Sequence, residues 1–137
     1  MMISTRGRYA LRVMLDLAER TDGHYTPMKD VAERQGLSLK YLERILPVLT
    51  KNGMVEGIQG KGGGYRLTKS LGEYRVGEIL RLTEGGLHPV ECAGCSTEPC
   101  EHAAACRTKP LWEGLNRVVN EYLDSITLED LMNGNCK

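Results

Sequence analysis

Four cysteines in the second half of the chain are the residues best suited to chemistry. Cys92, Cys95, Cys100 and Cys106 lie within fifteen residues, separated by two, four and five residues. Thiolates are soft ligands that select zinc, copper(I) or iron–sulfur clusters. A structural zinc site usually pairs two tight Cys-x2–4-Cys units, and here only Cys92/Cys95 is tight. The wider gaps leave room for something larger than one ion, so an iron–sulfur cluster, zinc or a reversible disulfide are the alternatives.

The same segment offers a histidine and a possible redox pair. His102 lies between the last two of these cysteines and is a candidate ligand, although a solvated loop residue is its simpler interpretation. Cys92 and Cys95 also have the spacing of a thiol-redox enzyme, but no thioredoxin-like βαβ pattern surrounds them. Since we find no general base, oxyanion donor or substrate cleft, we expect no enzyme. Cys136 is expected to be a spare thiol.

Charge is unevenly distributed along the 137 residues, which contain 18 basic and 18 acidic side chains. Residues 1–69 hold 12 basic and 7 acidic residues, whereas residues 70–137 hold 6 and 11. Opposite charge in the two halves is typical of a protein that meets a polyanion at one end. Arg6 and Arg8 stand at the start of a predicted helix over residues 5–20, where cations oppose the helix dipole. They are therefore candidate phosphate contacts, with a solvated face as the alternative.

The composition is that of an ordinary globular protein. Hydrophobic residues make up 41% and charged residues 26%, which is too apolar for a disordered chain. At this length a domain buries enough surface to fold without disulfides. No stretch has the pattern of a membrane span or a secretory signal, so we expect a cytoplasmic protein. Clustered cysteines in that compartment indicate metal or redox chemistry.

Residues 26–52 carry the pattern of a helix-turn-helix. Thr26-Pro27 predicts a helix start with Thr as N-cap and Pro as the first helical residue, and Gly36 predicts its end. Ser38 is expected to cap the second helix, and Pro47 predicts a kink or a shortening of that helix. Its buried stripe is expected to be Leu42, Ile45, Leu46 and Leu49. Its polar face is expected to be Lys40, Tyr41, Glu43 and Arg44.

A small β-wing is predicted directly after the helix-turn-helix. Two β-compatible runs, at 54–58 and 65–68, flank the glycine-rich residues 59–64. This glycine run matches no phosphate-loop or dinucleotide pattern, since Tyr65 takes the final glycine position of the latter. Antiparallel strands with a basic, glycine-rich tip suit a wing whose main chain approaches the DNA backbone closely.

The second half predicts a short helix over 76–84, the cysteine loop at 87–106 and a long helix over 110–125. The long helix has a stripe of apolar side chains, which are Leu111, Leu115, Val118, Tyr122 and Leu123. Because a 70-residue winged unit has little apolar surface to spare, dimerisation is favoured over packing of this helix on its own domain. We expect a mainly α fold with a small β-wing, in which a winged helix-turn-helix domain (1–70) precedes a connecting helix, the cysteine loop and a dimerisation helix (71–137).

Five short motifs give the chain a family resemblance. They are Ser-Thr-Arg-Gly-Arg-Tyr-Ala at 4–10, Leu-Ser-Leu-Lys-Tyr-Leu-Glu at 37–43, Lys-Asn-Gly at 51–53, Gly-Gly-Gly-Tyr at 62–65 and Ser-Ile-Thr-Leu at 125–128. In this order they resemble the Rrf-type bacterial transcription regulators, the IscR/NsrR/CymR-like winged-helix repressors, over nearly the whole chain. The resemblance implies a homodimer, usually a repressor, that binds double-stranded DNA at a palindromic operator.

The resemblance also implies a ligand set. In the cluster-bearing branch of the family, three cysteines before the long helix hold a [2Fe–2S] or [4Fe–4S] cluster. By their order and their distance to the long helix, those three resemble Cys92, Cys100 and Cys106. The position of a histidine ligand found in some relatives, three residues after the last cysteine, holds Lys109, which cannot serve.

The fourth ligand is where this sequence departs most from the family. Some relatives supply a carboxylate or histidine from the partner chain at two positions that hold Arg8 and Arg12 here. Cys95 is then the natural local replacement, and His102 is the alternative fourth ligand.

Expected DNA contacts follow from the helix-turn-helix and from the resemblance. Relatives commonly carry an arginine before the first wing glycine, whereas this chain has Gln59, so Lys61 or Arg66 is expected to take over its charge. Glu43 suits cytosine N4 and Arg44 suits guanine in the major groove, with an ion pair inside the helix as the alternative role for Glu43. The expected DNA-binding residues are Arg6, Arg8, Ser38, Lys40, Tyr41, Glu43, Arg44, Gln59, Lys61 and Arg66.

The leading hypothesis is thus a dimeric DNA-binding repressor that senses redox or iron–sulfur status through its cysteine loop. The second hypothesis keeps the DNA binding and places a structural zinc or a thiol–disulfide switch at that loop. The third is a thiol-redox enzyme that uses Cys92 and Cys95.

Overall fold

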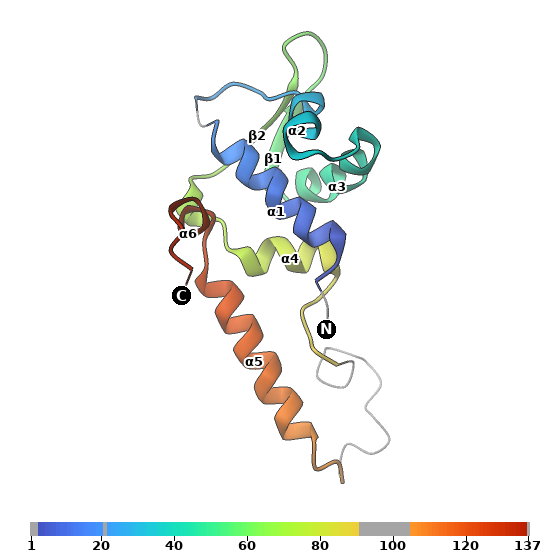
Figure 1. The fold of residues 1–137 in the computed structure, drawn as a ribbon, viewed down its shortest axis with the longest axis vertical. Coiled ribbons are helices and arrows are strands. Elements are labelled where there is room, and N and C mark those ends of the chain that lie inside the picture. Colours follow the sequence, from blue (N-terminus) through green and yellow to red (C-terminus); the bar gives the residue numbers. More distant parts are fainter. Residues whose placement is uncertain (1–2, 21, 91–104, 137) are drawn as a thin grey trace.

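The computed structural model describes residues 3–20, 22–90 and 105–136. It is mainly helical with one two-stranded antiparallel sheet, as the sequence predicts. Most elements pack into one body, from which a single long helix, α5, extends away from the sheet (Figure 1). Within the described residues, no helix is both long and apolar enough to cross a membrane.

The helix-turn-helix forms as predicted, with α2 (Met28–Gln35) and α3 (Leu39–Lys51) joined by a tight turn. Gly36 ends α2 in the left-handed region with φ +65°, which favours glycine. The Ser38 hydroxyl accepts a hydrogen bond from the Tyr41 N–H at 3.0 Å and caps α3. The helix is not shortened at Pro47, because α3 continues four residues beyond it to Lys51.

The start of α2 differs from the prediction. Pro27, and not Thr26, is the N-cap residue. The Thr26 N–H donates to the Tyr65 carbonyl at 2.8 Å, and the Tyr65 N–H donates to the Thr26 carbonyl at 2.9 Å. These two bonds hold Thr26 in a bridge to the wing, so its backbone is unavailable for a helix cap.

The wing consists of β1 (Val55–Ile58) and β2 (Gly64–Leu67). They pair antiparallel, with Val55 opposite Leu67 and Ile58 opposite Gly64. A Cβ atom at Gly64 would lie 2.2 Å from the Thr26 carbonyl oxygen, so only glycine allows the bridge between wing and α2. The wing is therefore fixed to the helix-turn-helix by backbone contacts.

The core lies around α1 (Thr5–Ala18), which packs against α2 and against α4 (Val76–Glu84). Buried side chains of α1, α2, α3 and β1 form one cluster, and η1 (Leu71–Glu73) and α6 (Leu128–Asn133) cover its end. A second, smaller cluster lies where α4 meets the residues that precede α6, and its buried members are Val76, Leu80, Leu87 and Ile126.

Helix α5 (Lys109–Ser125) is attached to this body mainly by polar contacts with α4. Arg81 donates to both carboxylate oxygens of Asp124, at 2.7 and 2.8 Å, and to the Asn120 side chain at 2.9 Å. No residue of α5 is buried. Its C-terminal part is therefore held by α4, while its N-terminal part projects away from the body (Figure 1).

Tyr74 is a fully buried side chain between η1 and α4, and it makes several hydrogen bonds. Its hydroxyl donates to the Met54 carbonyl at 2.7 Å and accepts from the N–H groups of Thr68 and Lys69, at 2.8 and 3.1 Å. Met54 directly precedes β1 and Thr68 directly follows β2. One hydroxyl thus closes the base of the wing.

Replacing Tyr74 with phenylalanine should lower the free energy of unfolding by about 1–3 kcal/mol, because buried backbone groups at the wing base lose their partner. The measurement is urea denaturation followed by circular dichroism. Tyr9→Phe is the matched control, since no hydrogen bond of the Tyr9 hydroxyl is found among the described residues, and it should change the value by less than about 0.5 kcal/mol. Equal losses in the two variants would contradict the role of the Tyr74 hydroxyl.

Candidate nucleic-acid interface and metal centre

The exposed face of α3 carries three charged side chains. Lys40, Glu43 and Arg44 are all exposed. Within the described residues, none of the three makes an ion pair or a side-chain hydrogen bond, so the ion pair considered for Glu43 does not form there. This face is available to a ligand, and its mix of donors and acceptor suits base edges in a major groove.

Two other predicted contact residues on α3 have structural partners. The Ser38 hydroxyl is occupied by the helix cap. The Tyr41 ring packs edge-on against the Tyr9 ring, with 5.5 Å between the ring centres. Tyr9 in turn lies under the Arg12 guanidinium, 5.4 Å from its carbon. These contacts fix the first turn of α3 against α1; whether Ser38 and Tyr41 also contact DNA stays a prediction.

A buried carboxylate holds the helix-turn-helix against α1. The Asp16 side chain is 1% exposed. Arg34 donates to both of its oxygens, at 2.8 and 3.1 Å, and the Gln35 amide donates at 3.0 Å. Arg12 donates to the Gln35 side chain and to its backbone carbonyl, at the C-terminal end of α2. Burial would raise the pKa of Asp16, but the hydrogen bonds from Arg34 and Gln35 outweigh it and hold that pKa below its ordinary value.

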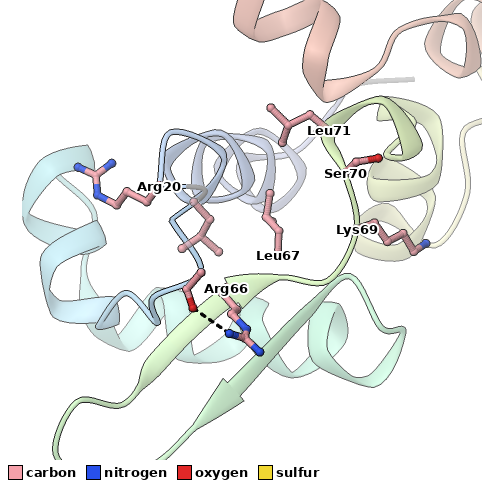
Figure 2. Close-up of a pocket in the computed structure, with 8 residues that line it drawn as sticks. Arg20, Arg66, Leu67, Lys69, Ser70 and Leu71 are labelled. Carbon is pink, nitrogen blue, oxygen red and sulfur yellow. Dashed lines mark hydrogen bonds between the residues drawn. The ribbon is translucent and has the colours of Figure 1, made fainter.

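The polar residues at the wing tip are exposed, whereas Arg66 on the wing strand β2 has structural partners. Gln59 and Lys61 are exposed at the tip, and neither has a polar partner among the described residues. Arg66 on β2 instead forms an ion pair with Glu56 across the sheet, and its guanidinium lies 4.4 Å from the centre of the Tyr25 ring. It also donates to the Gly23 carbonyl at 2.8 Å, drawn as the dashed line in Figure 2. Arg66 therefore braces the wing, and a DNA contact by it stays a prediction.

The N-terminal turn of α1 is capped from α4. The Glu84 carboxylate accepts from the Ser4 N–H at 2.9 Å, the Ser4 hydroxyl at 2.6 Å and the Gly7 N–H at 3.2 Å. A Cβ atom at position 7 would come 2.3 Å from that carboxylate, so any larger residue there would displace Glu84 from this cap. Arg6 and Arg8 are exposed on this turn, where Arg8 donates to the Thr5 hydroxyl. Sequence patterns gave no signal for Asp16, Tyr74 or Glu84, because their partners are distant in sequence.

Of the predicted metal ligands, Cys92, Cys95, Cys100 and His102 lie outside the described residues. Cys106 is described, and its sulfur lies 3.1 Å from the hydroxyl of Thr108, the N-cap residue of α5. Hydrogen bonds from the Thr108 hydroxyl and backbone lower the pKa of Cys106 and favour its thiolate. The described residues contain no group of three His, Cys, Asp or Glu side chains placed to bind a metal ion.

A cavity of about 350 Å³ lies between α1, β2 and η1 (Figure 2). Leu17, Leu67 and Leu71 are among its lining residues. Figure 2 shows the charged ends of Arg20 and Lys69 pointing away from its centre. Because the charges do not converge, we assign no ligand to this cavity.

Comparison with known proteins places this geometry in a family. A family model named Rrf2, described as an iron-dependent transcriptional regulator, matches residues 3–134. The chain belongs to the Rrf2 family. It is 38% identical to the HTH-type transcriptional regulator IscR of Pectobacterium carotovorum over 97% of this chain and 80% of that protein.

Solved structures of Rrf2-type regulators have the same fold. CymR, the global cysteine regulator of B. subtilis, is 38% identical with a TM-score of 0.78, over 96% of this chain and 95% of its own. IscR of T. potens is 35% identical with a TM-score of 0.77, over 98% and 88%. The chain is therefore a transcription regulator of the Rrf2 family, and regulators of this family bind DNA.

The Asp16 carboxylate makes the stability of the fold pH-dependent. Asp16→Asn should lower the free energy of unfolding by roughly 1–3 kcal/mol at pH 7, because Arg34 loses its charged partner. Since the pKa of Asp16 is lowered in the folded state from 3.8, its contribution is present above that value and is lost as the pH falls below it.

The difference between wild type and Asp16→Asn in urea denaturation should therefore shrink below about pH 4. Asp22→Asn is the control, because its carboxylate is exposed and its ion-pair partner among the described residues is His24 on the same loop. A difference that stays constant down to pH 2 would contradict the role of the Asp16 charge.

Proposed function

We propose that this Rrf2-family regulator is a homodimeric repressor whose DNA binding responds to an iron–sulfur cluster at its cysteine loop. The observation that carries the DNA-binding part is the exposed face of α3. Lys40, Glu43 and Arg44 project from this helix, and none of them forms an ion pair or a side-chain hydrogen bond with another described residue. In a helix-turn-helix this second helix enters the major groove. The basic wing tip supplies a second contact with the DNA backbone.

The dimer is supported by the exposed apolar face of α5. Leu111 and Val118 are 61% and 58% exposed, and Leu115 and Tyr122 share the same stripe. This stripe has the i, i+4, i+7, i+11 spacing of one helix face, and the described part of the same chain leaves it exposed. A second copy of α5 covers it with matching apolar side chains, which gives an isologous two-fold interface. A two-fold protein reads a palindromic operator.

The metal site is proposed from the donor set, with Cys92, Cys100 and Cys106 as ligands and Cys95 or His102 as the fourth. The chemistry of this donor set fits an iron–sulfur cluster, because thiolates are the soft ligands that such clusters require. Cys106 is the described member of the set, and its sulfur lies 3.1 Å from the Thr108 hydroxyl at the start of α5. A bound cluster supplies a centre whose charge and integrity depend on redox conditions and iron supply.

Both ends of the cysteine loop are attached to α5. At one end, the Leu87 carbonyl accepts from the Asn120 amide at 2.7 Å. At the other end, Cys106 contacts Thr108 at the first turn of α5. Asn120 also accepts from Arg81, which holds α5 on the DNA-binding body. A change in the loop is therefore transmitted to α5 and to the spacing of the two copies of α3.

A second candidate keeps the DNA binding and replaces the cluster with zinc or a thiol–disulfide switch. The thiol–disulfide switch is favoured by the structural similarity to CymR. The oxidised form of Staphylococcus aureus CymR is 34% identical to this chain, with a TM-score of 0.75 over 96% of this chain and 95% of its own. Metal and thiol analysis of the purified protein distinguishes the two candidates.

Arg44→Ala should weaken binding to DNA selected by the wild-type protein from random sequence by on the order of tenfold, through loss of a base contact. Lys61→Ala should weaken binding to all sequences and reduce the salt slope of log K by about 1 for each protomer. Fluorescence anisotropy over a range of salt concentrations measures both. Arg117→Ala removes the same charge from the extended helix and should leave affinity unchanged. Unchanged binding by both Arg44→Ala and Lys61→Ala would contradict the proposed interface.

Anaerobic reconstitution should give iron and acid-labile sulfide in equal amounts, with visible charge-transfer absorption. Cys106→Ser should lose most of both because a ligand is missing, whereas Cys136→Ser should retain them. Stoichiometric zinc that is unaffected by oxygen would favour the second candidate. Wild-type protein without iron, sulfide or visible absorption would contradict the cluster.

A further inference from the structure

Leu39, the first residue of α3, is a large apolar side chain that is exposed and takes no part in the core. Its side chain is 42% exposed, although it follows the N-cap residue Ser38 directly. It belongs to neither buried cluster and is not among the side chains packed against them. The other leucines and the isoleucine of α3, by contrast, are buried, and they are Leu42, Ile45, Leu46 and Leu49. The core therefore does not explain a leucine at position 39.

The position of Leu39 puts it on the charged face of α3. Glu43 lies one turn further along the same side of the helix, and Lys40 is the next residue. Residues of the first turns of a recognition helix are those that contact base edges. An exposed leucine at this position therefore contacts the same ligand as Lys40 and Glu43.

A leucine side chain has no hydrogen-bond donor or acceptor, so neither phosphates nor polar base edges explain it. The apolar group that the major groove presents is the 5-methyl group of thymine. We infer that Leu39 is a specificity-determining residue that packs against a thymine methyl group in each half-site. This inference rests on the proposed DNA-binding function. Because four residues advance a helix by about 6 Å, less than two base-pair steps, that thymine lies within two base pairs of the base that Glu43 contacts.

Replacement of thymine by deoxyuridine in the selected operator tests this contact, since it removes only the methyl group. Deoxyuridine at the contacted thymine of one half-site should weaken wild-type binding about fourfold, as expected for the loss of one buried carbon group. The same change in both half-sites should weaken it on the order of fifteenfold. Leu39→Ala changes both protomers, so it should bind the thymine operator on the order of fifteenfold more weakly than the wild type. It should bind the thymine and uracil operators equally well. Alanine is a good helix former, so α3 should be retained.

Ile58→Ala is the matched control, because Ile58 is similarly exposed, at 48%, but lies at the end of β1 in the wing. It should keep the full penalty for uracil at that position. Wild-type binding that is indifferent to uracil at every thymine, or a uracil penalty that persists in Leu39→Ala, would overturn the inference while leaving DNA binding intact. Failure of the wild-type protein to select any DNA would overturn the proposed function and this inference with it.

Discussion

The hydroxyl of Tyr74 joins the beginning of β1, the end of β2 and the residues before α4 through three hydrogen bonds, one buried and two partly buried. The bond to the Met54 carbonyl is buried and the other two are partly buried, so loss of the hydroxyl would leave backbone groups at the base of the wing without a partner, which is costly. The bridge between Thr26 and Tyr65 then ties the wing to α2. With Asp16 holding α2 to α1, the wing tip and the exposed face of α3 belong to one rigid unit.

That rigid unit is connected to the cysteine loop in two directions. Glu84, at the end of α4, caps the first turn of α1, where Arg6 and Arg8 are exposed. Asn120 and Arg81 connect the beginning of the loop to α5. In the proposed mechanism, a change at the cysteines alters the angle of α5 on the body, and the two α3 helices of the dimer change their separation. Small displacements suffice, because operator half-sites have a fixed spacing on the duplex.

Caps and residue spacing predicted the helices and strands well, but they did not predict contacts between residues that are far apart in the sequence. Ser38 and Gly36 predicted the limits of α3 and α2 because caps depend on neighbouring residues. The N-cap role predicted for Thr26 was wrong because a strand distant in sequence takes its backbone bonds. Asp16 and Tyr74 act through partners far along the chain, so no spacing rule shows them. Three of the four clustered cysteines lie outside the described residues, and their ligand role still rests on the sequence.

The central claim is that α5 joins two copies of the chain, so that two α3 helices and two wings contact one operator. Hydroxyl-radical footprinting of the operator tests this claim most directly. We expect two protected segments related by two-fold symmetry, with centres about 34–36 Å apart along the duplex or a multiple of that distance. Leu115→Glu, which places a charge in the exposed apolar stripe of α5, should abolish the paired pattern. A single asymmetric protected segment from the wild-type protein, or an unchanged paired footprint from Leu115→Glu, would contradict the account.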